Sequence, residues 1–343
     1  MKPMTAYQDA IQRIAEQKRR LGGRLSILAH HYQSDEIVAQ ADITGDSLEL
    51  ARRIDTLDAE LIVFCGVYFM AESAAILRRP DQKIFTPEPE ATCPMADMAD
   101  AESVRRTLAA LGKGRTIVPL TYVNSSAAVK AVVGEAGGSV CTSANASTML
   151  RWALDRGDAV LFLPDRHLGW NTADKLGLSE RERLLIDPAF PDADAAAKAR
   201  LLLWPGHCPV HDAYGAELVE KARREHPGCL VAVHPESPPA VVAAADADGS
   251  TSFLIRWCEQ APEGSTLVIG TEASLVDRLA ARYKGGKTIL HLDMGWCEDM
   301  RKTTPDTLAD LLERIDSARP EDVAEAIRIP ARLALEKMLQ ACS

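Results

Sequence analysis

Three of the eight cysteines lie in loop-like sequence, two of them directly before a proline: Cys93, Cys208 and Cys297. Cys297 follows His234 by 63 positions, and Cys93 follows His30 by the same 63 positions. A looser middle copy of this pattern ends at Cys208. Loop thiolates are metal or cluster ligands when the chain can turn around the bound group. The repeated spacing therefore predicts that the three cysteines ligate one metal centre.

Hydroxyl residues repeat with the same spacing. Ser47 and Thr251 each follow the unit's histidine by 17 positions, and in the middle copy Ser143 follows Tyr122 by 21. Each hydroxyl stands where the pattern predicts that a helix opens. Helix N-termini present backbone N–H groups and a positive partial charge to anions. We therefore expect Ser47, Ser143 and Thr251 to hold phosphate or carboxylate groups rather than only to cap helices.

The three cysteines by themselves are compatible with two kinds of metal centre, zinc and an iron–sulfur cluster. A structural zinc site prefers four ligands, so zinc would need a histidine such as His211 beside the three cysteines. A [4Fe–4S] cluster held by three cysteines instead leaves one iron open. An open position can bind a hydroxyl or carboxylate and ease the loss of water. The spacing favours the open iron–sulfur cluster.

Several ionisable side chains follow apolar runs and could serve as general acids or bases: His30, Tyr32, Tyr122, His211, His234 and Glu236. The other histidines are interpreted as structural: His31, His167, His207, His226 and His291. Glu72 and Glu272 are interpreted as helix N-terminal carboxylates.

Composition narrows the class of protein. The chain has 343 residues, 47% of them hydrophobic and 26% charged, as in ordinary globular proteins. The net charge of −10 argues against a general nucleic-acid binder. No apolar run is long enough to span a membrane, and the first residues do not form a signal peptide. We therefore expect a cytoplasmic protein whose partners are small molecules, and in which a disulfide framework is not expected.

Three similar units follow from the periodicity. Each is expected to be β-α-β-α-β, with strands at 24–30, 60–65 and 83–86, at 116–123, 139–142 and 158–165, and at 229–234, 265–270 and 288–292. This pattern predicts an α/β protein of three three-layer α/β/α domains, with parallel sheets in a pseudo-threefold arrangement around a central active site. The expected borders are 1–100, 101–215 and 216–304, with closing helices in 305–343.

Nine ordered motifs together resemble the quinolinate synthase family: AHHYQ at 29–33, GDSLELAR at 45–52, FMAESA at 69–74, ATCP at 91–94, YVNSSAAVKA at 122–131, CTSAN at 141–145, CPVH at 208–211, HPE at 234–236 and GSTS at 249–252. The resemblance runs from about residue 25 to residue 305. It implies condensation of iminosuccinate (iminoaspartate) with dihydroxyacetone phosphate, with loss of phosphate and two waters, to quinolinate for de novo NAD biosynthesis. It also implies a transferase with a functional link to L-aspartate oxidase.

The resemblance implies roles residue by residue. Cys93, Cys208 and Cys297 would ligate a [4Fe–4S] cluster with one open iron. The substrates would be bound by His30, Ser47, Tyr122, Val123, Asn124, Ser143, His234, Pro235, Glu236 and Thr251. Tyr32, Tyr122, His211 and Glu236 would be the catalytic groups. The chain departs from some members, which carry Cys-x-x-Cys-x-x-Cys at the last ligand, because His291 and Met294 replace the first two cysteines here.

Two rival functions stay open at the level of sequence. A zinc-dependent aldolase or hydrolase could use the same cysteines and histidines. A non-catalytic iron–sulfur sensor would need an output surface, such as a basic helix or an appended domain, and the sequence suggests neither. Metal content separates the first rival from the iron–sulfur enzyme.

Overall fold

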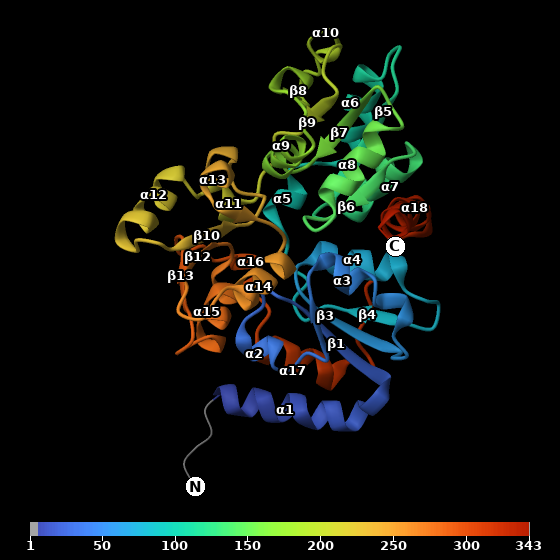
Figure 1. The fold of residues 1–343 in the computed structure, drawn as a ribbon. Coiled ribbons are helices and arrows are strands. Elements are labelled where there is room, and N and C mark those ends of the chain that lie inside the picture. Colours follow the sequence, from blue (N-terminus) through green and yellow to red (C-terminus); the bar gives the residue numbers. More distant parts are fainter. Residues whose placement is uncertain (1–5, 343) are drawn as a thin grey trace. The chain divides into compact units, whose positions relative to one another are not determined.

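The computed structural model describes residues 6–342 and has three parallel β-sheets of four, five and four strands (Figure 1). This confirms the predicted α/β fold class. The chain forms two compact units. The first runs to residue 93 and includes 297–323, and the second combines 94–296 with the residues from 324 onward. No helix within residues 6–342 is long and apolar enough to cross a membrane.

The first unit contains one sheet in the order β2-β1-β3-β4. Its strands are β1 (Leu25–His30), β2 (Ile43–Gly45), β3 (Leu61–Cys65) and β4 (Lys83–Phe85). Its helices are α1 (Ala6–Leu21), α2 (Asp35–Val38), α3 (Ser47–Ala51), α4 (Tyr68–Leu77), α16 (Glu298–Arg301) and α17 (Pro305–Arg314), with 3₁₀ turns at Gly22–Arg24 and Ile54–Thr56. Helices α1 and α17 lie on one face of the sheet, and α3 and α4 lie on the other (Figure 1).

Helix α17 completes the core of the first unit although it is distant in sequence. Leu308, Leu311 and Leu312 of α17 are buried with Ile14 of α1. Parallel strands covered on both faces are apolar along their whole length, and all six residues of β1 and all five of β3 are buried.

The second unit contains two sheets. The five-stranded sheet has the order β6-β5-β7-β9-β8. Its strands are β5 (Ile117–Tyr122), β6 (Ser139–Cys141), β7 (Ala159–Leu163), β8 (Arg183–Leu185) and β9 (Leu201–Leu203). Its helices are α5 (Pro94–Asp97), α6 (Ala101–Leu111), α7 (Ala127–Glu135), α8 (Ala146–Leu154), α9 (Arg166–Lys175), α10 (Ala193–Ala196) and α18 (Glu325–Ala341), with a 3₁₀ turn at Glu180–Glu182.

The other sheet of the second unit has the order β11-β10-β12-β13. Its strands are β10 (Leu230–Val233), β11 (Ala247–Asp248), β12 (Thr266–Gly270) and β13 (Thr288–His291). Its helices are α11 (Pro209–Asp212), α12 (Ala216–Glu225), α13 (Pro239–Ala244), α14 (Thr251–Gln260) and α15 (Ala273–Arg282). The two four-stranded sheets thus share one strand order, and the five-stranded sheet repeats it with β8 added at one edge.

The sequence pattern missed the shortest strands. We expected three strands per unit, whereas β2, β11, β8 and β9 add strands of two or three residues, and β2, β11 and β8 lie at sheet edges. Such strands form because a neighbouring strand pairs with them. Two or three residues are too few to show the apolar–polar alternation that predicts a strand.

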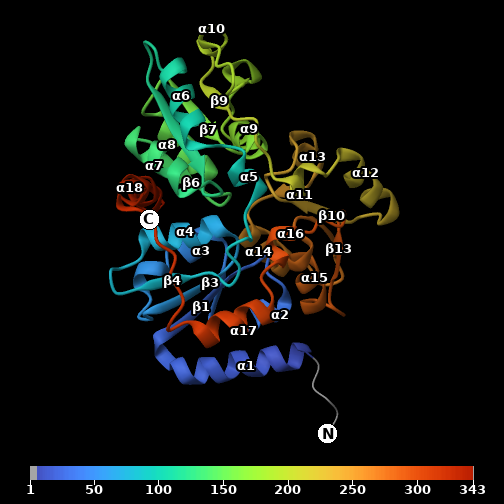
Figure 2. The ribbon, with the colours of Figure 1, turned by 180° about the vertical axis from the view of Figure 1, so that it is seen from behind.

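Helix α18 packs against α7 and β6 within the second unit, as both views show (Figure 2). The backbones approach closely at Gly134 of α7, where an added Cβ would lie 1.8 Å from the carbonyl oxygen of Pro330. Glycine allows two helices to approach to this distance because it has no side chain.

Gly134→Ala is therefore expected to destabilise the protein by about 2–3 kcal/mol, since the methyl group must push backbone against backbone. Denaturant unfolding measures the loss. Gly23→Ala is the matched control, because nothing lies within 4 Å of the added Cβ, and it should change stability by less than about 0.5 kcal/mol. Equal stability of the two variants would contradict the packing argument.

Candidate functional site

Polar residues end the central strand of each sheet. His30 is the last residue of β1, Tyr122 is the last residue of β5, and His234 directly follows β10. All three are buried. Apolar strands sandwiched between helix layers bring their C-terminal ends to one edge of a parallel sheet, which is where ligands bind in α/β proteins.

The two histidines at the strand ends are oriented in the same way. The backbone N–H of Tyr32 donates to His30 Nδ1 at 3.1 Å, and the N–H of Glu236 donates to His234 Nδ1 at 3.4 Å. Because Nδ1 accepts in both cases, the neutral ring carries its proton on Nε2. Each histidine can thus offer an N–H donor to a bound anion. The rings of His30 and Tyr32 also meet edge to face, with centroids 4.9 Å apart.

Glu236, His211 and Thr271 form a buried hydrogen-bonded line in the second unit. His211 Nδ1 lies 2.7 Å from Glu236 Oε2, and His211 Nε2 lies 3.2 Å from Thr271 Oγ1. The ring of His211 stacks on that of His234 with centroids 4.6 Å apart. A carboxylate only accepts, so His211 Nδ1–H donates to Glu236 and Nε2 accepts from the Thr271 hydroxyl. This arrangement can pass a proton from Thr271 towards Glu236.

The charge states in this group follow from burial and hydrogen bonding. Burial lowers the pKa of His234 to about 3, so the ring is neutral near pH 7. For Glu236, burial acts to raise the pKa, but His234, the hydrogen bond from His211 and that from Tyr122 outweigh it and lower the pKa to about 2. Since His234 is neutral, we attribute the ionised state of Glu236 mainly to the two hydrogen bonds.

Tyr122 ends β5 and leads into a short loop that contains one buried polar atom without a hydrogen-bond partner in the described residues. The Tyr122 side chain hydrogen-bonds to Glu236. Val123 is buried, and its N–H donates to the carbonyl of Cys141 at 2.8 Å. Asn124 Oδ1 is buried and has no hydrogen-bond partner within residues 6–342. A buried amide oxygen without a partner is costly, which is the condition expected where a ligand donates to it.

The three hydroxyl residues differ in their local structure. Ser47 and Thr251 are the first residues of α3 and α14, but the N-caps are Asp46 and Ser250. The expectation that a helix opens at Ser143 is wrong, because α8 begins at Ala146.

Ser143 instead lies inside a hydrogen-bonded turn. Asn145 Oδ1 accepts from the N–H of Thr142 at 2.7 Å, and the N–H of Asn145 donates to the Thr142 carbonyl at 3.1 Å. The side-chain amide competes with helix formation and delays the first helical turn.

Seven of the eight cysteines fall into two groups; the eighth, Cys342, is partly exposed after α18, and its Sγ contacts Asn145 Nδ2 and Met149 Sδ. Four are buried: Cys65, Cys141, Cys229 and Cys258. Burial raises the pKa of Cys65 and Cys258 to about 12, so these thiols are poor ligands. The three cysteines with repeated spacing are partly exposed, and each directly precedes a short helix: Cys93 before α5, Cys208 before α11 and Cys297 before α16.

The structure divides the predicted site residues between the two units. The first unit contains His30, Tyr32, Ser47, Cys93 and Cys297. The second contains Tyr122, Val123, Asn124, Ser143, Cys208, His211, His234, Pro235, Glu236 and Thr251. Within the second unit, side-chain ligand atoms of Cys208, His211 and Glu236 all lie within 4.8 Å of one another.

His167, which was interpreted as structural from the sequence, holds α11 in place together with Arg166. Asp212 of α11 binds His167 Nε2 at 2.5 Å and Arg166 Nη2 at 2.8 Å. Burial lowers the pKa of His167. Asp212 and Cys208 lie at opposite ends of α11, so this network fixes the helix that follows the cysteine. Thr271 was not predicted, and the one available signal is its place directly after β12.

Comparison with known proteins gives concordant matches. A family model described as NadA, quinolinate synthetase A protein, matches residues 11–340. The quinolinate synthase of Corynebacterium glutamicum is 46% identical over 341 residues, 96% of this chain and 86% of that protein. Those of Streptomyces coelicolor and Acidobacterium capsulatum are 44% and 43% identical, covering 98% and 96% of this chain and 89% and 92% of those proteins. The similarity thus extends along the chain.

Proposed function

This chain belongs to the quinolinate synthetase A family, and we propose that it condenses iminosuccinate with dihydroxyacetone phosphate to form quinolinate, with loss of phosphate and two waters, in de novo NAD biosynthesis. The observation that carries this proposal is the buried Thr271–His211–Glu236 line, which meets Tyr122 and His234 at strand ends. Condensation followed by dehydration needs groups that take up and return protons away from bulk water. The buried line provides them.

Members of the family are [4Fe–4S] enzymes, and we propose that Cys93, Cys208 and Cys297 hold the cluster and leave one iron open. The donor set fits this group, because these cysteines are partly exposed and lie at turns into short helices. The buried thiols of Cys65 and Cys258 do not suit ligation, because their pKa values are raised. When bound, such a cluster supplies Lewis-acid assistance to the loss of water.

Proton transfer is assigned to the chain's own residues. Glu236, ionised near neutral pH, accepts the Nδ1 proton of His211 as His211 Nε2 takes the Thr271 hydroxyl proton, and a proton from the bound substrate replaces the latter at Oγ1. The Tyr122 hydroxyl donates a hydrogen bond to the same carboxylate. Tyr32 is proposed as a further acid or base at the end of β1.

Substrate binding is assigned to donors suited to anions. Iminosuccinate carries two carboxylates and dihydroxyacetone phosphate carries a phosphate, so both need hydrogen-bond donors. We propose that His30 and His234 donate from Nε2, and that the hydroxyls of Ser47, Ser143 and Thr251 donate alongside backbone N–H groups. Val123, Asn124 and Pro235 would complete the contacts in the loops after β5 and β10.

Two further proposals rest on the family and on the repeated topology. Because iminosuccinate is unstable, we infer a functional link to L-aspartate oxidase as its source. We also propose that the chain has three α/β domains with borders near residues 100, 215 and 304. The common order of the sheets supports three domains, and the terminal helices divide between the units, α17 packing with α1 and α18 with α7.

Metal analysis of anaerobically purified protein tests the proposed function. We expect about four irons and four sulfides per chain, broad absorption in the blue and formation of quinolinate from the two substrates. Zinc in a one-to-one ratio without sulfide would overturn the cofactor and favour a zinc-dependent aldolase or hydrolase. That rival has one observation in its favour, the close grouping of Cys208, His211 and Glu236.

A further inference from the structure

Asn171, on helix α9, touches the loop that carries Glu236. The residue is 2% exposed. The single amide nitrogen Nδ2 donates to the carbonyl oxygen of Pro235 at 2.8 Å and to that of Ser237 at 2.8 Å. These carbonyls belong to the residues immediately before and after Glu236. The orientation of the amide is determined chemically, because both partners are acceptors and only the NH₂ group can donate to them.

The loop has few donors with which to satisfy itself. Pro235, Pro238 and Pro239 have no backbone N–H, so three of the five residues from 235 to 239 donate nothing. Within the loop, the N–H of Ser237 donates to the carbonyl of His234 at 3.0 Å. Buried carbonyls need partners, and here a side chain from another part of the chain supplies two. The loop conformation therefore depends on Asn171.

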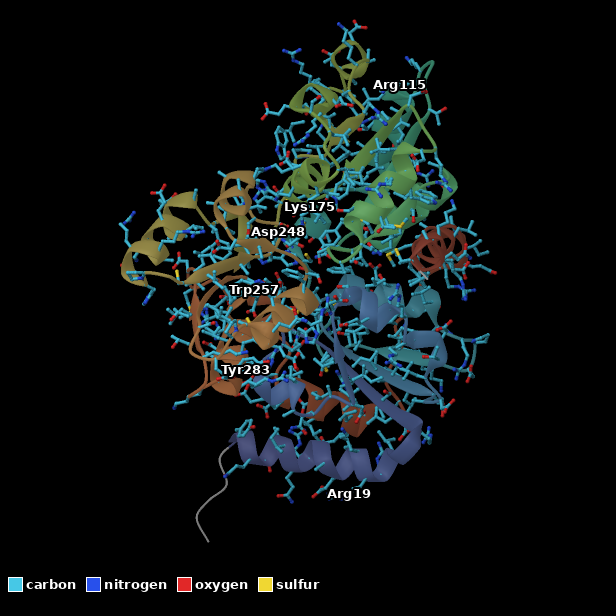
Figure 3. The ribbon with its side chains drawn as sticks, in the orientation of Figure 1. Arg19, Arg115, Lys175, Asp248, Trp257 and Tyr283 are labelled. Atoms are coloured by element: carbon cyan, nitrogen blue, oxygen red, sulfur yellow. The ribbon has the colours of Figure 1, made fainter. Side chains whose placement is uncertain are left out.

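Helix α9 is itself firmly placed. Asp165, fully buried, accepts from the N–H of Leu168 and caps the helix. At the other end, Lys175 forms an ion pair with Asp248 of β11 (Figure 3). Asn171 lies between these two contacts, and the buried cap at Asp165 fixes the helix that presents the amide to the loop.

We propose that Asn171 is a positioning residue that holds Glu236 in register with His211 and Tyr122. This inference rests on the proposed function, in which Glu236 takes up protons. A misplacement of about 1 Å in a reacting group can cost roughly 10²-fold in rate. The two hydrogen bonds from Asn171 prevent this displacement by holding both sides of Glu236.

Asn171→Asp is the sharpest test, because it changes an NH₂ group into an oxygen of the same size. A carboxylate facing two carbonyl oxygens is repelled, and burial raises the pKa of such a group. Only the protonated form can donate a hydrogen bond. We expect kcat to fall about 10²-fold at pH 8.5 and by clearly less at pH 6.5, with a smaller change in KM.

Lys175→Ala is the matched control, because it removes one ion pair between α9 and β11 and leaves both hydrogen bonds from Asn171 to the loop in place. It should leave kcat within about 2-fold of the starting protein at both pH values. A kcat ratio for Asn171→Asp that does not vary with pH, or an equal loss in Lys175→Ala, would overturn the proposal.

Hydrogen exchange measured by mass spectrometry tests the clamp without using the reaction. Asn171→Ser stays neutral but has a single O–H donor on a shorter side chain, which cannot bond both carbonyls, and it serves if the aspartate variant does not fold. In Asn171→Ser the amides of Glu236 and Ser237 should exchange at least about 10-fold faster than in Lys175→Ala; equal exchange would overturn the proposal. If the starting protein made no quinolinate, the proposed function would fall, while faster exchange in Asn171→Ser would still support the clamp.

Discussion

Replacing Cys297 with alanine is expected to remove iron and sulfide from the protein and to lower quinolinate formation by at least about 10³-fold. A cluster held by three thiolates cannot keep its place on two, and Lewis-acid assistance contributes several kcal/mol to such reactions. At 1.36 kcal/mol per factor of ten, losing that assistance gives a loss of this size. Iron and sulfide content, the blue absorption and turnover should be measured on the same preparation.

Cys229→Ala is the control for this variant. Cys229 directly precedes β10 and is buried. Burial raises the pKa of its thiol, so it should not be a ligand. The control should keep its iron, sulfide and turnover and lose only the stability of a small core truncation, about 1 kcal/mol. If Cys297→Ala kept both the cluster and full turnover, the assignment of the ligand and the mechanism would both be wrong.

The sequence was sufficient to predict the strand ends that carry polar groups. An uninterrupted apolar run followed by a polar cluster indicates a buried parallel strand, and His30, Tyr122 and His234 all end such runs. The spacing from these residues to the hydroxyl residues and cysteines was recognisable because the same intervals recur in the first and third units. Local patterns of this kind are visible because burial acts on every residue of a strand.

Contacts between distant residues could not be predicted in the same way. Thr271 reaches His211 across 60 positions, and Asn171 reaches Pro235 across 64. Neither residue belongs to a spaced motif that repeats among the units. Their roles arise from tertiary packing, since the fold of the second unit brings the Asn171 side chain on α9 to the loop after β10.

Ser143 shows how a local rule can fail at a site. A serine before an apolar helical run resembles an N-cap, but the amide of Asn145 binds the backbone of Thr142 and moves the first helical turn to Ala146. Helix α8 therefore begins three residues after Ser143, because the Asn145 side chain accepts a hydrogen bond from the backbone in front of it. A turn of this kind leaves Ser143 partly exposed in front of the helix.

Glu236→Gln is expected to keep the cluster and lower kcat by about 10²–10⁴-fold, which is the usual contribution of a positioned acid or base. Glutamine has the same shape and can still accept from His211 Nδ1–H, but it cannot take up a proton. Iron content and circular dichroism should match the starting protein. Glu225→Gln, an exposed change on α12, is the matched control and should leave kcat within about 2-fold.

The pH dependence of kcat distinguishes Glu236→Gln, which removes a proton acceptor, from Asn171→Asp, which is expected to displace the loop. The pKa of Glu236 is lowered to about 2, so the carboxylate is ionised throughout the range of pH 5 to 9 and is protonated only as the pH falls towards that value. The ratio of kcat between the starting protein and Glu236→Gln should therefore be constant from pH 5 to 9. The corresponding ratio for Asn171→Asp should rise with pH, because its new carboxylate titrates within that range. A ratio for Glu236→Gln that fell steeply below pH 7 would mean that Glu236 is protonated there, and the proton path would have to start from another residue.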